Sequence, residues 1–183
     1  MAGPETTATS LVVNVADLLH RPAARRRDRH TLVAGPLQVL STVVPAGTEV
    51  AVDTMLEWVS DGILATGTAT APWVAECRRC LAPVEGSITA PFQELFEVES
   101  REGESYPLKG DRMDLAPLVT EALLLGLPLA PLCREGCAGL CPTCGADLNR
   151  GPCACDPAPP DPRWAALDVL REDPPTGDTA GSG

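Results

Sequence analysis

The sequence predicts an α+β fold, in which one helix covers a twisted antiparallel β-sheet and a small cysteine-rich module follows. Three observations predict it. The stretch from Leu37 to Val98 is rich in Val, Thr and Ala and partly alternates between apolar and polar residues. Apolar residues at helical spacing follow Asp114, and six of the eight cysteines lie between residues 133 and 155.

The first elements are short. Residues 1–10 are small and polar, which predicts a disordered tail. A β-branched run over 11–15 predicts a strand, and a helical turn follows at 16–19. The next segment holds five arginines, which could contact phosphate oxygens through bidentate hydrogen bonds or form an exposed loop with no binding role. These are Arg21, Arg25, Arg26, Arg27 and Arg29.

The main sheet is expected from four strands. Their approximate ranges are 38–44, 49–58, 63–75 and 84–98. A polar loop then covers 100–112. Asp114 can cap a helix over 114–125, whose apolar stripe would lie on the sheet. That stripe consists of Leu115, Leu118, Val119, Ala122 and Leu123.

Two units are predicted from this order. A β-rich α+β domain spans 11–130, and a cysteine-rich module with a short docking helix near 164–170 spans 131–171. A second disordered tail is expected over 172–183, after a proline-rich spacer.

Charge and hydropathy restrict the compartment and the partners. The chain has 183 residues and a net charge of −11, yet residues 1–34 hold five arginines against three acids. This acidity disfavours non-specific binding of a bare nucleic-acid duplex and suits a basic protein partner. The longest apolar run, 122–132, is too short for a membrane span, and the first ten residues do not form a secretory signal. We therefore expect a cytoplasmic protein with reduced thiols.

Reduced cysteines at these spacings predict a structural zinc site. In Cys141-Pro-Thr-Cys144-Gly145, two intervening residues allow both thiolates to reach one ion. Binding would hold a segment that has few large apolar side chains. The first assignment takes the four closely spaced residues Cys133, Cys137, Cys141 and Cys144.

Other partitions remain open at this stage. One rival set is Cys137, Cys141, Cys144 and Cys153. Alternatively, eight thiols could form two sites, with Cys77 and Cys80 joining Cys153 and Cys155.

Catalytic interpretations have less support. Both histidines, His20 and His30, lie far in sequence from the cysteines, which favours a closed structural site over a catalytic one. Arg78 and Arg79 between Cys77 and Cys80 could activate a redox thiol, but the βαβ context of thioredoxin-like sites is missing. We therefore expect a protein that is not an enzyme.

Three segments together resemble the YceD family of bacterial and plastid large ribosomal RNA subunit accumulation proteins. They are Cys77-Arg-Arg-Cys80-Leu81, the helical segment 114–125, and the run from Pro131 through Cys-Ala-Gly-Leu-Cys-Pro-Thr-Cys-Gly-Ala-Asp-Leu to Asn149. The closing segment, 161–171, is also similar. The resemblance implies a role in the synthesis, processing or stability of 23S rRNA and in assembly of the large subunit, and it supplies no catalytic residue.

Charge and resemblance together predict a non-enzymatic assembly factor of the large ribosomal subunit. Its partners would be the pre-ribosomal large subunit, through rRNA, basic ribosomal proteins or both, with no membrane and no small-molecule substrate. The five arginines would touch rRNA phosphates, and Arg78 and Arg79 are further candidates for this contact. The alternative is a zinc-dependent protein-interaction or regulatory module that does not bind RNA.

Overall fold

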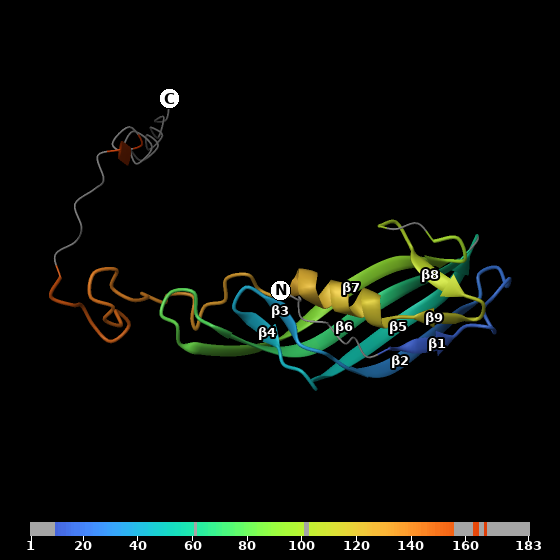
Figure 1. Ribbon diagram of the computed structural model, residues 1–183, viewed down its shortest axis with the longest axis horizontal. Helices are drawn as coiled ribbons and strands as arrows, with labels where there is room; N and C mark the ends of the chain where they lie inside the picture. The colour runs from blue at the N-terminus through green and yellow to red at the C-terminus, as the bar shows by residue number, and fades with distance from the viewer. Residues whose placement is uncertain (1–9, 61, 101–102, 156–162, 165–166, 168–183) are drawn as a thin grey trace, which may run out of the picture.

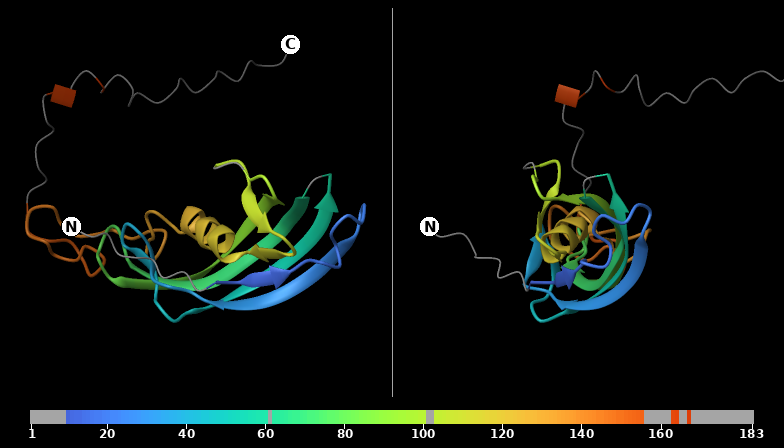
Figure 2. Two further views of the ribbon diagram at one scale, coloured as in Figure 1. Left: turned by 45° about the vertical axis from the view of Figure 1, so that its right-hand side comes forward. Right: turned by 90° about the vertical axis from the view of Figure 1, so that its right-hand side faces the viewer.

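The fold is a long, curled β-sheet with a single α-helix on its concave side, as Figures 1 and 2 show for the described part of the chain. The computed structural model describes residues 10–60, 62–100, 103–155, 163–164 and 167. The strands within them are β1 (Val12–Asn14), β2 (Arg25–Val33), β3 (Leu37–Val39), β4 (Thr42–Val44), β5 (Glu49–Val59), β6 (Gly62–Glu76), β7 (Pro83–Glu97), β8 (Tyr106–Lys109) and β9 (Arg112–Asp114).

The sheet runs in the order β2-β5-β6-β7-β8-β9-β1, and the β3–β4 hairpin pairs with the far end of β6. The strands β5, β6 and β7 pair along most of their length and form its centre. The predicted α+β class is confirmed, but the sheet is mixed and not purely antiparallel, because β8 runs parallel to β7. The two strands overlap only at Phe96↔Tyr106 and Glu97↔Pro107, so the chain can join them without a long crossover.

The core lies between the concave face of the sheet and the helix α1 (Ala116–Gly126). Along β5 the residues Val50, Val52 and Leu56 point inward and are at most 2% exposed, while their neighbours face outward. Leu118 and Leu123 of α1 are also buried, and the helix packs on β7, β6 and β3. This alternation is what a sheet with one covered face requires.

The helix matches the predicted one to within two residues at its start and one at its end. Leu115 occupies the N-cap position, and Asp114 is the last residue of β9. The Asp114 carboxylate nevertheless accepts hydrogen bonds from the backbone N–H groups of Ala116 (3.0 Å) and Leu11 (2.8 Å). The carboxylate therefore pairs a backbone N–H at the helix start that has no partner within the helix, and it also fixes the chain just before β1.

Three segments differ from the sequence expectation. The arginine-rich segment is not a loop, since residues 25–33 form β2 and pair with β5. The strand expected over 38–44 is divided into β3 and β4 by a turn at Leu40, whose φ is 54°. The polar loop expected over 100–112 contains β8 and the start of β9, which pair as a short hairpin.

The C-terminal expectations are largely untested. Most of the docking helix predicted over 164–170 and the tail over 172–183 lie outside the described residues, as do residues 1–9 of the N-terminal tail. The domain division at residue 130 stays a prediction. No helix in the described part of the chain is both long and apolar enough to cross a membrane.

Candidate metal centre

The long β6–β7 hairpin ends in a tight cysteine turn. Cys77 and Cys80 lie between the last residue of β6 and the first of β7. The Cys77 N–H donates to the Ala82 carbonyl (2.7 Å), and the Leu81 N–H donates to the Cys77 carbonyl (2.9 Å). Leu81 adopts a positive φ of 61°, which allows the chain to turn back around the sulfurs.

A second turn, after the helix, repeats the same backbone pattern. The Cys141 N–H donates to the Ala146 carbonyl (2.8 Å), and the Gly145 N–H donates to the Cys141 carbonyl (2.9 Å). Gly145 follows the second cysteine of this turn, as Leu81 does in the first turn, and it also has a positive φ, of 72°. The two Cys-x-x-Cys segments, far apart in the sequence, are therefore matching turns, which we call knuckle I (77–81) and knuckle II (141–145).

The eight sulfurs fall into two groups of four. Group I contains Cys77, Cys80, Cys133 and Cys137, and group II contains Cys141, Cys144, Cys153 and Cys155. Within each group the sulfur atoms lie within 4.8 Å of one another, and each group could hold one metal ion. No disulfide is formed among these eight cysteines.

This grouping corrects the partitions considered from the sequence. The first assignment, Cys133 with Cys137, Cys141 and Cys144, is divided equally between the two groups. The rival set with Cys153 is divided as well, and Cys77 and Cys80 do not join Cys153 and Cys155. The reason is topological: the β6–β7 hairpin brings its tip beside the segment that follows the helix, a proximity that sequence spacing does not reveal.

The sulfur spacing fits a single tetrahedral ion. Zinc binds thiolates at about 2.3 Å, so the sulfurs of a four-cysteine site lie about 3.8 Å apart. In group I the Cys77 and Cys137 sulfurs are 3.8 Å apart, and the Cys80 and Cys133 sulfurs are 3.6 Å apart. Four thiolates also leave no open ligand position, which is the arrangement of structural sites.

Backbone contacts hold the two parts of group I together. The Arg78 N–H donates to the Pro131 carbonyl (2.9 Å), and the Leu140 N–H donates to the Arg79 carbonyl (3.0 Å). The Arg79 guanidinium donates to the carbonyl of Cys137 (2.8 Å). Arg78 and Arg79 thus contribute their backbone, and Arg79 its side chain, to docking the hairpin tip on the post-helix segment.

Asn149 fixes the loop between the two groups, and sequence reasoning did not single it out. Its side-chain carbonyl accepts from Arg134 (2.6 Å) and from the Ala138 N–H (2.9 Å). Its amide donates to Asp147 (2.8 Å) and approaches the Cys137 sulfur at 3.5 Å. An amide that bonds both a ligand sulfur and the adjacent loop orients the ligand, as outer-shell groups do in metal sites.

Hydrogen bonding favours the thiolate form of the first cysteine in each knuckle. The pKa of Cys77 is lowered to about 6 by the backbone N–H of Cys133 and then by that of Cys80. The pKa of Cys141 is lowered to about 6 by the N–H groups of Cys144 and Thr143. Backbone N–H groups directed at sulfur stabilise its negative charge, with or without a metal.

Other sulfurs retain their protons when no metal is bound. A hydrogen bond with the Cys80 sulfur raises the pKa of Cys133 to about 12, and one with Cys144 raises the pKa of Cys155 to about 12. Four sulfurs this close cannot all be thiolates unless a cation compensates their charge. A divalent ion would replace these protons, so loading should release protons.

The arginines predicted to bind phosphate do not share one face of the structure. Arg25, Arg27 and Arg29 share the exposed outer face of β2, opposite the core. Arg27 and Arg29 both contact the Asp53 carboxylate of β5, at 2.8 and 3.1 Å. The Arg25 guanidinium lies 3.4 Å from the carboxylate of Glu57, which belongs to β5 as Asp53 does.

Arg26 and Arg21 differ from this row. Arg26 is directed to the other side of β2, where it bonds Asp28 (2.8 Å), Asp17 and the Asn14 carbonyl (2.9 Å), and so bridges β2 to β1. Arg21 lies in the turn before β2 and donates to the Asp17 carbonyl (3.3 Å). The structure therefore brings three of the predicted arginines into one exposed row and gives Arg26 a structural position.

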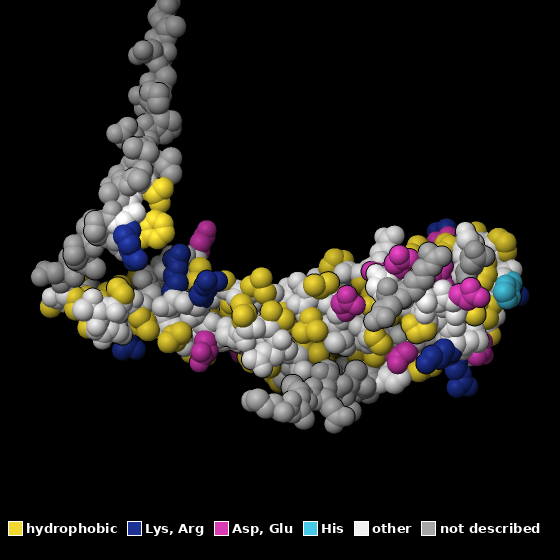
Figure 3. All heavy atoms as spheres, turned by 45° about the horizontal axis from the view of Figure 1, so that its top comes forward, with side chains coloured by type: hydrophobic (Ala, Val, Ile, Leu, Met, Phe, Trp, Pro, Cys, Tyr) yellow, Lys and Arg dark blue, Asp and Glu magenta, His cyan; other side chains and the backbone are white. Residues whose placement is uncertain are grey.

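Figure 3 shows how charge is distributed on one face of the molecule. Basic side chains gather at both ends, and acidic side chains are most numerous over the end that carries β8 and β9. Arg78 and Arg79 lie at the cysteine end, so they do not join the row on β2.

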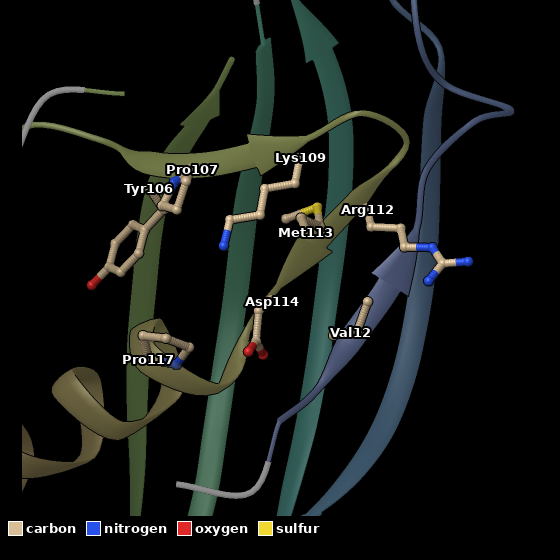
Figure 4. Close-up of a pocket in the computed structure, with 8 residues that line it drawn as sticks. All are labelled: Val12, Tyr106, Pro107, Lys109, Arg112, Met113, Asp114 and Pro117. Carbon is tan, nitrogen blue, oxygen red and sulfur yellow. The ribbon is translucent and has the colours of Figure 1, made fainter. Parts of the chain in front are cut away.

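A pocket of about 370 Å³ lies at the other end, between β1, β8, β9 and the start of α1. Its lining is mostly apolar, with Val12, Met113 and Pro117 among its residues. Figure 4 shows the Lys109 ammonium directed toward it and the Arg112 guanidinium directed away. This pocket shares no residue with the cysteine groups and plays no part in the metal centre.

The fold and the site define a class of protein: an α+β protein whose curled sheet carries one cysteine knuckle and whose C-terminal segment carries its counterpart. The chain belongs to the YceD family, described as large ribosomal RNA subunit accumulation protein YceD. The family model matches residues 65–171, which include both knuckles and the helix.

Relatives of similar length occur in mycobacteria. The uncharacterized protein Rv2926c of Mycobacterium tuberculosis is 36% identical over 169 residues, which cover 87% of this chain and 81% of the relative. The uncharacterized protein ML1660 of Mycobacterium leprae is 36% identical over 153 residues, covering 76% of this chain and 68% of the relative. No solved structure matches the chain.

Proposed function

We propose that the protein is a non-enzymatic assembly factor that supports synthesis, processing or stability of the 23S rRNA of the large ribosomal subunit in the cytoplasm. The observation that carries the proposal is family membership over residues 65–171, which include the whole cysteine framework. The metal centre supports a scaffolding role, because each group offers four thiolates and no open position for a substrate.

Zinc is the ion proposed for both groups. All eight ligands are thiolates, the sulfur spacing suits a bond length of about 2.3 Å, and zinc has no redox chemistry of its own. In group I it would join the hairpin tip to the segment after the helix. In group II it would shape residues 141–155 by itself, since all four sulfurs come from that short stretch.

Contact with rRNA phosphates is proposed for the exposed row on β2. Arg25, Arg27 and Arg29 form exposed ion pairs, and solvent screening makes such pairs contribute little to stability. Phosphate oxygens can therefore replace the carboxylates of Asp53 and Glu57 at little cost. Arg21, Arg78 and Arg79 remain secondary candidates, and Arg26 is assigned to holding β1 beside β2.

The functional test is depletion of the protein in cells of its source organism. The expected result is a lower ratio of large-subunit to small-subunit rRNA and co-sedimentation of the protein with precursors of the large subunit. Unchanged rRNA levels together with no particle association would exclude this role.

The RNA contact is tested separately by ultraviolet crosslinking in cells. Changing Arg25, Arg27 and Arg29 to Gln should remove most RNA crosslinks, since each lost charge removes one phosphate contact. The matched control changes Lys109, Arg112 and Arg150 to Gln, which removes the same number of charges elsewhere and should preserve the crosslinks.

The alternative function is a zinc-dependent protein-interaction or regulatory module that does not bind RNA. The net charge of −11 and the pairing of the arginine row with Asp53 and Glu57 favour it. It predicts no RNA crosslinks in the wild-type protein and unchanged partner binding in the Gln variant.

A further inference from the structure

Two exposed leucines adopt a backbone conformation that leucine rarely takes. Leu40, in the turn between β3 and β4, has a φ of 54° and is 68% exposed. Leu81, in knuckle I, has a φ of 61° and is 58% exposed. The left-handed region strains any residue that has a Cβ atom, and an exposed leucine gains nothing from burial to offset that strain.

Knuckle II shows that the turn itself does not require leucine. Gly145 holds the place of Leu81, with a φ of 72° and the same hydrogen bond to the first cysteine carbonyl. Glycine adopts this conformation without strain. The Leu81 side chain is therefore neither needed for the turn nor part of the core, and its presence needs another explanation.

The two leucines line the same surface groove. This groove, of about 250 Å³, is also lined by Leu129, which is 61% exposed, and by Cys77 of group I. Its leucines come from the β3–β4 turn, from knuckle I and from the segment after α1. Contiguous apolar surface from three separate segments is typical of an interaction site.

We propose that this groove, hereafter the leucine groove, binds a basic protein segment that inserts an aliphatic side chain between lysines or arginines. The partner class rests on the proposed function, in which the protein acts on the large ribosomal subunit. The groove has no aromatic side chain among its described lining residues on which a base could stack, which disfavours RNA. Glu76 and Arg78 both line the groove, so the local charge is balanced.

The net charge of the chain favours a basic partner. With 25 acidic and 14 basic residues, the protein as a whole attracts basic proteins more than acidic ones during approach. Glu76 is exposed and forms no ion pair with any described residue, so it can accept a lysine or arginine of the bound segment.

The test places a photo-crosslinking amino acid at Leu81 of the full zinc-loaded chain. Purified proteins of the large ribosomal subunit are the probes, each offered singly. The expected result is a crosslink to one or a few of them, at a segment with an aliphatic residue flanked by lysine or arginine, identified by mass spectrometry.

Glycine variants then separate binding from stability. Leu40→Gly and Leu81→Gly should each weaken binding of the crosslinked protein about tenfold or more, as loss of an interface anchor does. Neither should lower the Tm or the zinc content, because each relieves the strained backbone. Ala23→Gly, which relieves the same strain elsewhere (φ 59°), and Val98→Ser, at a 71% exposed site, should leave binding unchanged.

Several outcomes would overturn the proposal. A crosslink to residues 164–171 of the same chain would make the groove an internal docking site, and a crosslink to a second copy would make it a dimer interface. RNA as the only adduct, no adduct at all, or full binding by both glycine variants would also refute it. If the protein still co-sediments with large-subunit precursors in those cases, the proposed function stands and only the leucine groove fails.

Discussion

Asp53 is the residue on which the exposed arginines of β2 converge. Its carboxylate accepts hydrogen bonds from Arg27 (2.8 Å) and Arg29 (3.1 Å), and these lower its pKa to about 2. Sequence reasoning placed the arginines near phosphates or in a loop and did not find this partner, because Asp53 lies far along the chain. Only the β2–β5 register, with Arg29 opposite Asp53, brings them together.

Removing these arginines should return the pKa of Asp53 toward its ordinary value of 3.8. Arg27→Ala should have the larger effect, because the Arg27 hydrogen bond is the first cause of the shift, and Arg29→Ala the smaller. Since the folded pKa is lowered, the ionised pair stabilises the fold above pH 3.8, and this contribution is lost as the pH falls through about 2.

The measurement is a carboxyl carbon NMR titration of Asp53. Arg25→Ala is the matched control, because Arg25 pairs with Glu57 and should leave the Asp53 titration unchanged. A wild-type Asp53 that titrates near 3.8 would contradict the pairing.

At the scale of elements, the two cysteine groups connect segments that are separated by very different lengths of chain. Group I joins the tip of the β6–β7 hairpin to residues 133 and 137, far along the chain, whereas group II closes a loop within 141–155. The knuckle at 141–145 was visible in the sequence from its spacing and Gly145. The partition was not, because it depends on how far β6 and β7 extend and where the chain returns after α1.

Loss of one cysteine in each group should therefore have unequal effects. Cys80→Ser should increase hydrogen exchange at residues 77–82 and 131–140, because the metal no longer joins these segments. Cys144→Ser should increase exchange only within 141–155. Hydrogen exchange measured by mass spectrometry compares them, and equal patterns in both variants would argue against two independent sites.

The long periodic elements were the ones that sequence could predict. The strands corresponding to β5, β6 and β7 and the helix α1 lie within a few residues of their predicted positions. Two short strands, β8 and β9, were missed, because four and three residues are too few to show a period. The three-residue β1 was found, since it lies within the β-branched run over 11–15. β2 was missed because its first five residues are all charged, and its pairing depends on acids supplied by β5.

At the scale of the whole molecule, the curled sheet carries functional candidates at separated places. The arginine row lies on the outer face of β2, and the leucine groove and both cysteine groups lie at the hairpin tip and beyond. A long hairpin with an end held by bound metal would suit the proposed scaffold between RNA and protein. Such an arrangement requires both metal sites to be loaded, since the described part of that end has few large buried side chains.

The most direct test is therefore the metal content of the purified full chain, measured by native mass spectrometry without chelator and under reducing conditions. Two zinc ions per chain are expected, one for each group, and Cys80→Ser and Cys144→Ser should each retain one. A wild-type chain without metal, or a single ion that either substitution removes, would contradict two separate four-cysteine sites.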